Sequence, residues 1–233
     1  MVSVQSRGRP DERRDSEMTI MDLVILARTT PVEATRFRHG VGQAHHAEYL
    51  SDSIKSALFA SQSHRTGTRL HIVLEAGTGI PRTLTLDGDV IGDLGELTET
   101  GIIRSLADAL DQTTNLVQGE SVALSTGIIV SVLAFEPALR ALGDPSGLIG
   151  GAGKEGVQDR PRFLLQPDGT DIRELDTAAG GVFVMSDHVP MPRKIAKSLI
   201  RRGYAPLSVG PRMLQTAHCI TLIHNEFDRS PLR

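Results

Sequence analysis

The chain has 233 residues, of which 39% are hydrophobic and 23% charged, a composition typical of folded globular proteins. Its formal net charge of -3 lacks the strongly basic character of a dedicated nucleic-acid-binding domain. The single cysteine, Cys219, excludes a disulfide within the chain, and no apolar run approaches the roughly 20 residues of a transmembrane helix. We therefore expect a soluble, cytoplasmic protein without a membrane segment.

The first residues predict a tail that precedes a single folded domain. Residues 1–17 alternate arginines with acidic residues and contain no apolar run, so they have little to bury and are expected to be disordered. They also lack the apolar core of a signal peptide. Residues 18–229 are predicted to form one domain.

The first part of that domain alternates strand-like and helix-like patterns. Short apolar or β-branched runs predict strands at residues 20–27, 70–74, 83–86 and 127–133. Apolar residues at three- and four-residue spacing predict helices at residues 49–61 and 102–110. The glycine-rich stretch Gly143–Gly156 predicts a mobile connection to the C-terminal part.

The C-terminal part contains short strands that are each followed by turn residues. Strands are predicted at residues 163–165, 182–185 and 205–209, and the turns at Pro167-Asp168-Gly169, Ser186-Asp187-His188 and Gly210-Pro211. A basic helix is predicted at Pro192–Arg202 and a mostly buried helix at Met213–Phe227. Strands that alternate with helices predict an α/β fold with a largely parallel sheet flanked by helices.

Common catalytic signatures are absent from the sequence. It contains no GxGxxG after a predicted strand, no GxSxG and no CxxC pattern, and its eight histidines do not group at metal-ligand spacing, so no metal is predicted. Cys219 follows His218, but neighbours on a helix point about 100° apart, which favours a buried cysteine over a Cys–His nucleophile. The residue pattern alone therefore predicts a soluble α/β domain without a specified reaction.

Four sequence blocks, in the same order along the chain, resemble the TrmY family of tRNA pseudouridine N1-methyltransferases. The sequences of two of them are closer to the bacterial branch of that family. The blocks are Leu58–Arg65, Val182–Pro192 (VFVMSDHVPMP), Leu207–Leu214 (LSVGPRML) and Ala217–Asp228 (AHCITLIHNEFD). The resemblance extends from about Met18 to about Arg229. It implies a SPOUT-type α/β fold, in which the C-terminal chain threads a loop to form a trefoil knot, and a homodimer.

The same resemblance implies a cofactor and the residues that hold it. S-adenosylmethionine is expected to bind in the loops of the knot, beside a buried final helix. Carried over by position, the cofactor-binding residues are Leu165, Cys219, Ser186, Leu207 and Gly210.

The implied reaction is methyl transfer to N1 of pseudouridine in RNA, most readily tRNA. Asp187 and His188 are the candidate proton acceptors, although Asp187 is also suited to capping a turn. Arg65 is a candidate for holding a phosphate or the base, and an ordinary surface arginine is the alternative. The candidates for phosphate contacts are Lys194, Lys197, Arg201 and Arg202, or Arg36 and Arg38, and an ordinary solvated face is the alternative in each case.

Two other functions stay open on the sequence alone. The first keeps the chemistry but changes the substrate, to a pseudouridine in another RNA or to a free nucleoside. The second is a noncatalytic RNA-binding scaffold that has kept the fold.

Overall fold

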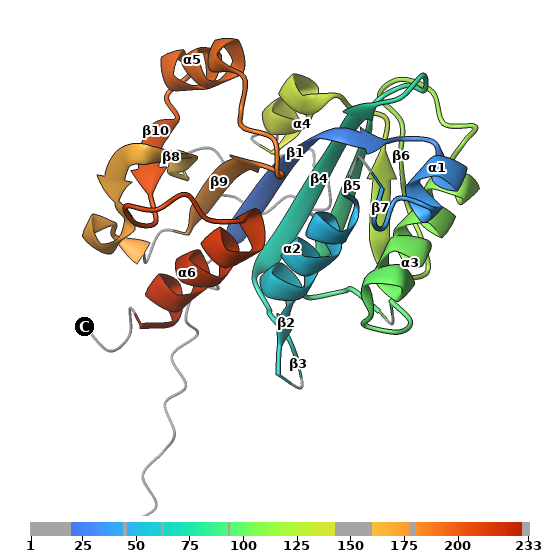
Figure 1. Cartoon of the computed structure of the whole chain (residues 1–233), viewed down its shortest axis with the longest axis horizontal. Coiled ribbons are helices and arrows are strands. Elements are labelled where there is room, and N and C mark those ends of the chain that lie inside the picture. The colour runs from blue at the N-terminus through green and yellow to red at the C-terminus, as the bar shows by residue number, and fades with distance from the viewer. Residues whose placement is uncertain are drawn as a thin grey trace, which may run out of the picture.

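The computed structural model describes residues 20–43, 46–61, 63–92, 94–142, 160–177 and 180–229. The predicted tail, residues 1–17, and the predicted connection, Gly143–Gly156, lie outside the described residues. Within the described residues, an eight-stranded sheet forms the centre of the molecule and helices cover both of its faces (Figure 1). The predicted α/β class and the largely parallel sheet are confirmed.

The sheet has a parallel half and an antiparallel half. Its strands follow the order β10-β8-β9-β1-β4-β5-β7-β6. The strands from β10 to β4 pair in parallel, and those from β4 to β6 pair antiparallel. The bounds are β1 Met21–Pro31, β4 Thr68–Ala76, β5 Arg82–Asp87, β6 Ser121–Ala123, β7 Ile128–Ser131, β8 Arg162–Asp171, β9 Gly181–Ser186 and β10 Ala205–Ser208, and a small hairpin pairs β2 Phe59–Ala60 with β3 Ser63–His64.

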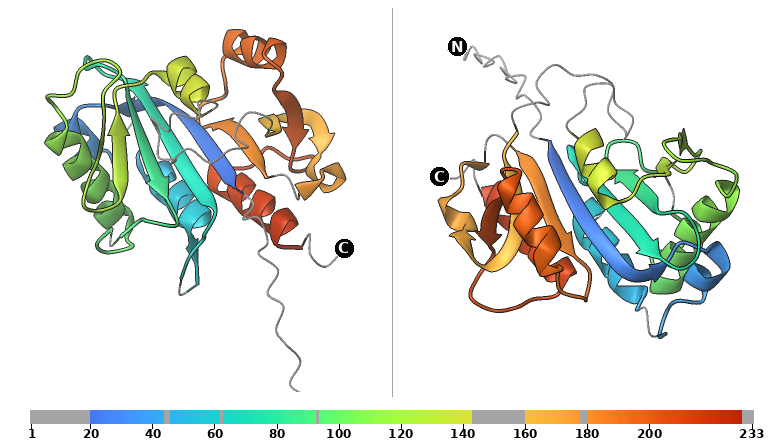
Figure 2. Two further views of the ribbon diagram at one scale, coloured as in Figure 1. Left: turned by 180° about the vertical axis from the view of Figure 1, so that it is seen from behind. Right: turned by 90° about the horizontal axis from the view of Figure 1, so that it is seen from above.

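The helices form two layers, one on each face of the sheet. Their bounds are α1 Ala34–Arg38, α2 Glu48–Leu58, α3 Glu99–Gln112, α4 Phe135–Ala141, α5 Arg193–Arg201 and α6 Thr216–Arg229, with a 3-10 turn at Ile172–Glu174. Buried residues of α1, α2, α3 and α6 share one apolar cluster, and those of α4 and α5 share a second cluster. The two layers are visible in Figures 1 and 2.

The central strand β1 serves both clusters because successive side chains of a strand point to opposite faces. Leu23 and Ile25 belong to the cluster with α2 and α6, whereas Val24 and Leu26 belong to the cluster with α4 and α5. A strand buried on both faces is apolar at nearly every position. This explains why the run at residues 20–27 is apolar at every position but Asp22, which is buried against Arg69 and Arg160, rather than alternating.

Two predicted elements of the C-terminal part differ from the structure. The strand predicted at residues 163–165 continues as β8 to Asp171, through the residues that were expected to form a turn. The last helix begins at Thr216 and not at Met213, whose side chain is 78% exposed. That helix is buried along one side only, where Ala217, Ile220, Ile223 and His224 face the core.

The described residues contain no helix that is long and apolar enough to cross a membrane. They also contain no group of three or more histidine, cysteine, aspartate or glutamate residues suited to hold a metal ion.

Candidate functional site

A bulge in β8 forms one wall of the candidate site. Consecutive residues of β10 pair with Leu164 and Thr170 of β8, so residues 165–169 lie outside the ladder between these strands. Gly169 allows the bulge to close against β10, because a Cβ atom there would lie 2.4 Å from the backbone nitrogen of Leu207. The bulge thus leaves backbone N–H and C=O groups outside the strand pairing, where they can meet a ligand.

The chain leaves β10 through a tight turn that forms the second wall. The Ser208 hydroxyl donates to the carbonyl oxygen of Gly210 at 3.0 Å and accepts from its N–H at 3.2 Å. Gly210 has φ +144°, a conformation that residues with a Cβ rarely adopt. The turn therefore needs a glycine at this position, and it directs residues 211–215 toward the start of α6.

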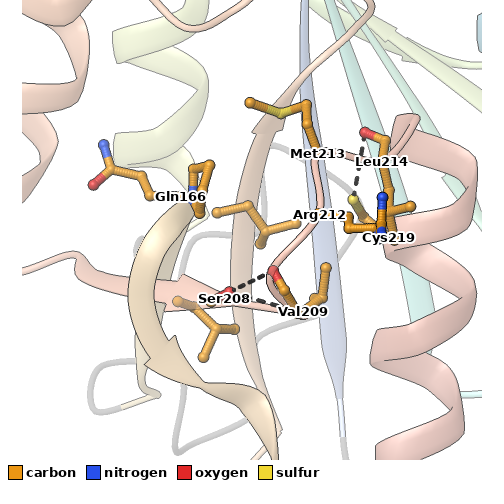
Figure 3. A pocket seen from close by; sticks show the side chains of 11 residues that line it. Gln166, Ser208, Val209, Arg212, Met213, Leu214 and Cys219 are labelled. Carbon is orange, nitrogen blue, oxygen red and sulfur yellow. Dashed lines mark hydrogen bonds between the residues drawn. The ribbon is translucent and has the colours of Figure 1, made fainter.

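An open cavity of about 70 Å³, here called the apolar cleft, lies between the bulge, the turn and α6. Figure 3 shows Gln166 on one side of it and Leu214 and Cys219 on the other. Its lining is mostly apolar and consists of Leu165, Gln166, Pro167, Leu207, Ser208, Val209, Gly210, Arg212, Met213, Leu214 and Cys219. The structure thus brings together Leu165, Leu207, Gly210 and Cys219, four of the five residues predicted to bind the cofactor.

Cys219 contributes a wall rather than a nucleophile. Its Sγ atom lies 3.9 Å from the carbonyl oxygen of Leu214, and burial raises the pKa of the thiol above its ordinary value. A thiol with a raised pKa stays protonated at neutral pH and is a poor nucleophile. The structure supports the expected packing role of this cysteine at the cleft.

Asp187 follows the end of β9, beside the N-terminus of α6. Its carboxylate accepts hydrogen bonds from the N–H groups of Arg28, at 3.2 Å, and Val189, at 2.9 Å. The Thr216 hydroxyl donates to the carbonyl oxygen of Ser186 at 2.6 Å, which fastens this loop to α6. Ser186 is not among the residues that line the apolar cleft. Its link to the site is the hydrogen bond from Thr216, at the start of α6, to its carbonyl oxygen.

The Asp187 side chain is only 1% exposed. Burial raises the pKa of this carboxyl, and the hydrogen bond from Val189 opposes the rise only in part. Asp187 therefore caps a turn, as one reading of the sequence expected, and is also a buried carboxylate at the edge of the site. His188 lies at its side, with Nδ1 3.9 Å from a carboxylate oxygen of Asp187 and 22% of its side chain exposed.

A second, smaller pocket lies on the other side of the first turn of α6. This aromatic hollow is lined by Tyr49, Asp52, His188, Gln215, Thr216 and Ala217. The rings of Tyr49 and His188 are 5.2 Å apart. Tyr49 is the first residue of the helix predicted at residues 49–61, where its spacing assigns it to the apolar face. The sequence gives only one signal for a place in a pocket, which is the scarcity of tyrosine in the chain.

Arg65 lies away from both pockets. Its guanidinium donates two hydrogen bonds to the carboxylate of Asp228, at 3.0 and 2.9 Å. At 1.5 Å per residue, Asp228 lies about 14 Å along α6 from Cys219. The structure does not bring Arg65 to the other predicted site residues, and its position ties the β2–β3 hairpin to the last helix.

The fold and the cleft define a class: an α/β protein with an apolar cleft where the parallel strands end, which is the usual position of a ligand site in such folds. The crystal structure of Nep1 from Archaeoglobus fulgidus, bound to S-adenosylhomocysteine, has the same fold. It matches with a TM-score of 0.55 and 9% sequence identity, and the match covers 93% of this chain and 100% of that chain.

Sequence comparison places the chain within a particular family. The model of the family described as "Putative SAM-dependent RNA methyltransferase" matches residues 20–232. The chain belongs to this family, and its cofactor is S-adenosylmethionine. This confirms the expected cofactor and the expected relationship.

Curated relatives match along nearly their whole length. The "Putative pseudouridine methyltransferase" of Vibrio atlanticus is 31% identical over 205 residues, which cover 88% of this chain and 96% of the relative. The protein of the same description from Photobacterium profundum is 32% identical over 205 residues, with the same coverage.

Proposed function

We propose that the protein transfers the methyl group of S-adenosylmethionine to N1 of pseudouridine in RNA, with tRNA as the preferred substrate. The observation that carries the proposal is the pair Asp187–His188, a buried carboxylate behind a half-buried imidazole, fastened to the same turn of α6 that walls the apolar cleft. The descriptions of the curated relatives support pseudouridine as the target base.

The apolar cleft is the proposed seat of the cofactor, with Leu165, Leu207, Gly210 and Cys219 against it and Ser186 behind it. The chemistry of the lining fits, because apolar side chains suit an adenine ring and the backbone groups of the bulge can hydrogen-bond to its edge. A cavity of about 70 Å³ is small for a whole nucleoside cofactor, so the loop between β10 and α6 is expected to move outward on binding. When bound, S-adenosylmethionine supplies a methyl group on a cationic sulfur, and its transfer to N1 leaves a neutral thioether.

His188 is the proposed acceptor of the proton that N1 loses. Its imidazole is exposed enough to reach a bound base, whereas the Asp187 carboxylate is almost fully buried and already accepts two backbone N–H groups. The carboxylate stabilises the imidazolium that forms when His188 takes the proton. Asp187 is therefore a positioning residue, and His188 is the catalytic residue of the pair.

Helix α5 is the proposed contact with RNA phosphates. Lys194, Lys197 and Arg201 lie on its exposed side, and Figure 1 shows the helix at one end of the molecule, next in the chain to the Asp187 loop. The other predicted phosphate contacts have protein partners: Arg202 of the α5 group pairs with Glu136. On α1, Arg36 pairs with Glu33 and Arg38 with Asp108. We therefore favour α5 over α1 as the RNA-binding surface.

We also propose that the C-terminal chain is knotted and that the protein is a cytoplasmic homodimer. The family resemblance supports both features. Light scattering coupled to size-exclusion chromatography tests the dimer.

Methyl transfer in vitro, followed by mass spectrometry of the digested nucleosides, tests the reaction. Unmodified tRNA carrying pseudouridine, a second pseudouridine-containing RNA and free pseudouridine are compared as substrates. N1-methylpseudouridine in tRNA is the expected product. Its formation only from the second RNA or from the nucleoside would replace the tRNA assignment, and calorimetric binding of the cofactor without any product would favour a noncatalytic scaffold.

The His188→Ala variant tests the proposed proton acceptor. We expect a fall in kcat of about 100-fold, an unchanged affinity for S-adenosylmethionine, and partial recovery of the rate in added imidazole. Asp111→Asn on α3 is the matched control, because it alters a charge that lies 3.8 Å from Arg38 and outside both pockets. Full activity of His188→Ala would remove the imidazole from the mechanism.

A further inference from the structure

The aromatic hollow gathers rings in a chain that has very few. The sequence contains no tryptophan, two tyrosines and six phenylalanines. Tyr204 is only 2% exposed, which leaves Tyr49 as the one tyrosine with a partly exposed ring. The His46 ring lies 5.5 Å from that of Tyr49 and 5.0 Å from that of His188, so the three rings form one cluster.

The backbone at His46 is strained, and local bonds hold it in place. His46 has φ +49°, a left-handed conformation that is uncommon for residues other than glycine. Its Nδ1 lies 2.9 Å from a carboxylate oxygen of Glu48, whose other oxygen accepts the N–H of Gly42 at 3.1 Å. Strain that the surroundings enforce in this way is concentrated at functional sites.

The aromatic hollow lies directly across the first turn of α6 from the apolar cleft. Gln215, Thr216 and Ala217 line the hollow, while Leu214 and Cys219 line the cleft. The Thr216 hydroxyl also lies 3.2 Å from the carbonyl oxygen of Asp187, to which it can donate. The two pockets therefore share the first turn of α6 as a common wall, and His188 lines the hollow.

We propose that the aromatic hollow, a depression of about 20 Å³, marks the binding site of the target base. An unpaired pyrimidine ring, turned out of the RNA, lies over its mouth and stacks against Tyr49. This inference rests on the proposed function. Aromatic side chains are the usual partners of splayed-out bases. Asp52 and Gln215 line the hollow and carry the acceptor and the donor that the imide edge of a uracil-type ring requires. One Asp52 oxygen also pairs with Lys55 Nζ at 2.7 Å. In this position N1 faces His188, with the cofactor on the other side.

Substitution of Tyr49 separates stacking from packing. Tyr49→Leu removes the ring but keeps an apolar side chain, and Tyr49→Phe keeps the ring. We expect Tyr49→Leu to raise the KM for RNA about tenfold or more, since the variant loses the ring on which the base stacks, and Tyr49→Phe to stay within about twofold. The affinity for S-adenosylmethionine should be the same in all three proteins. An unchanged KM in Tyr49→Leu, or a loss confined to kcat, would overturn the proposal.

Tyrosine fluorescence measures binding of RNA at the proposed base site without any turnover. Because the chain has no tryptophan, Tyr204→Phe leaves Tyr49 as its only strong emitter, and Tyr49→Phe is the matched control that leaves Tyr204. The probe is a short single-stranded RNA with one pseudouridine. Quenching of Tyr49 but not of Tyr204 is expected, and equal effects on both would overturn the proposal.

The two experiments also separate this inference from the proposed reaction. Quenching of Tyr49 without methyl transfer from any substrate would keep the base site and remove the reaction. Methyl transfer with neither quenching nor a change in KM would keep the reaction and remove the base site. A dimer that dissociates in Tyr49→Leu, as seen by light scattering, would assign the rings to a subunit interface and overturn the proposal.

Discussion

His224 gives the protein a stability that depends on pH. The side chain lies on α6, is only 3% exposed, and has its Nε2 3.0 Å from the carbonyl oxygen of Ala57 on α2. Burial, together with the positive charge of Arg65, lowers the pKa of His224 from 6.5 to about 4. The folded state therefore holds a neutral imidazole at pH values at which the unfolded chain has already bound a proton.

The sign and size of the effect follow from this difference. Above pH 6.5 His224 is neutral in both states and contributes no pH dependence. Between pH 6.5 and about 4 only the unfolded chain takes up the proton. The free energy of unfolding therefore decreases as the pH is lowered through this range. At ~1.36 kcal/mol per pKa unit, the loss reaches about 3 kcal/mol at pH 4.

Urea unfolding at a series of pH values, compared with His224→Gln, measures the effect. Glutamine can still donate to the Ala57 carbonyl but does not titrate, so the variant should lack this loss between pH 6.5 and 4. Carboxyls with a lowered pKa, such as those of Glu33 and Glu48, are common to both proteins and cancel in the comparison. An equal fall in stability for both proteins would refute the reasoning.

Three further predictions concern the cleft, the bulge and the RNA surface. Cys219→Trp should fill the apolar cleft and abolish the heat of S-adenosylmethionine binding in calorimetric titration. The control Cys219→Ala should weaken binding less than tenfold. Normal binding by the tryptophan variant would place the cofactor elsewhere. Gly169→Ala puts a Cβ against the backbone of β10 and should lower the free energy of unfolding by about 2 kcal/mol or more. The control is Gly92→Ala, whose Cβ would make only an ordinary contact at 3.4 Å and should cost about 0.5 kcal/mol or less. Equal losses of stability for the two variants in urea unfolding would contradict the close approach at Gly169. Lys197→Gln should reduce the slope of log affinity for RNA against log salt by ~0.7–0.9, and an identical slope to that of Arg140→Gln on α4 would remove α5 from the interface.

The elements that the sequence predicted best are those whose pattern depends on burial alone. The run at residues 182–185 became β9 because a strand covered on both faces is apolar at every position. The bulge of β8 was expected as a turn that ends a strand, because Pro167-Asp168-Gly169 has the same local chemistry in both settings. Only the pairing of Thr170 with Leu207 in β10 distinguishes the two.

The site was predicted where the family resemblance supplied it and missed where it depends on distant contacts. Leu165, Leu207, Gly210 and Cys219 do meet at one cleft. Tyr49 gave no such signal, because its partner His188 comes from the other end of the chain and periodicity reports only the neighbours on one helix.

The central position of β1 has a consequence for the newly made chain. One of its two partners in the sheet, β4, follows soon after it, but the other, β9, is among the last strands to be synthesised. At ~5–20 residues per second, the ribosome needs on the order of 10–30 s to reach β9 after β1 has been made. During that interval one edge of a strand that is apolar from Leu23 to Ala27 has no native partner, so the nascent protein depends on chaperones or on transient cover to avoid aggregation. The methyl donor cannot assist at this stage, because the helix that completes its proposed binding site is made later still.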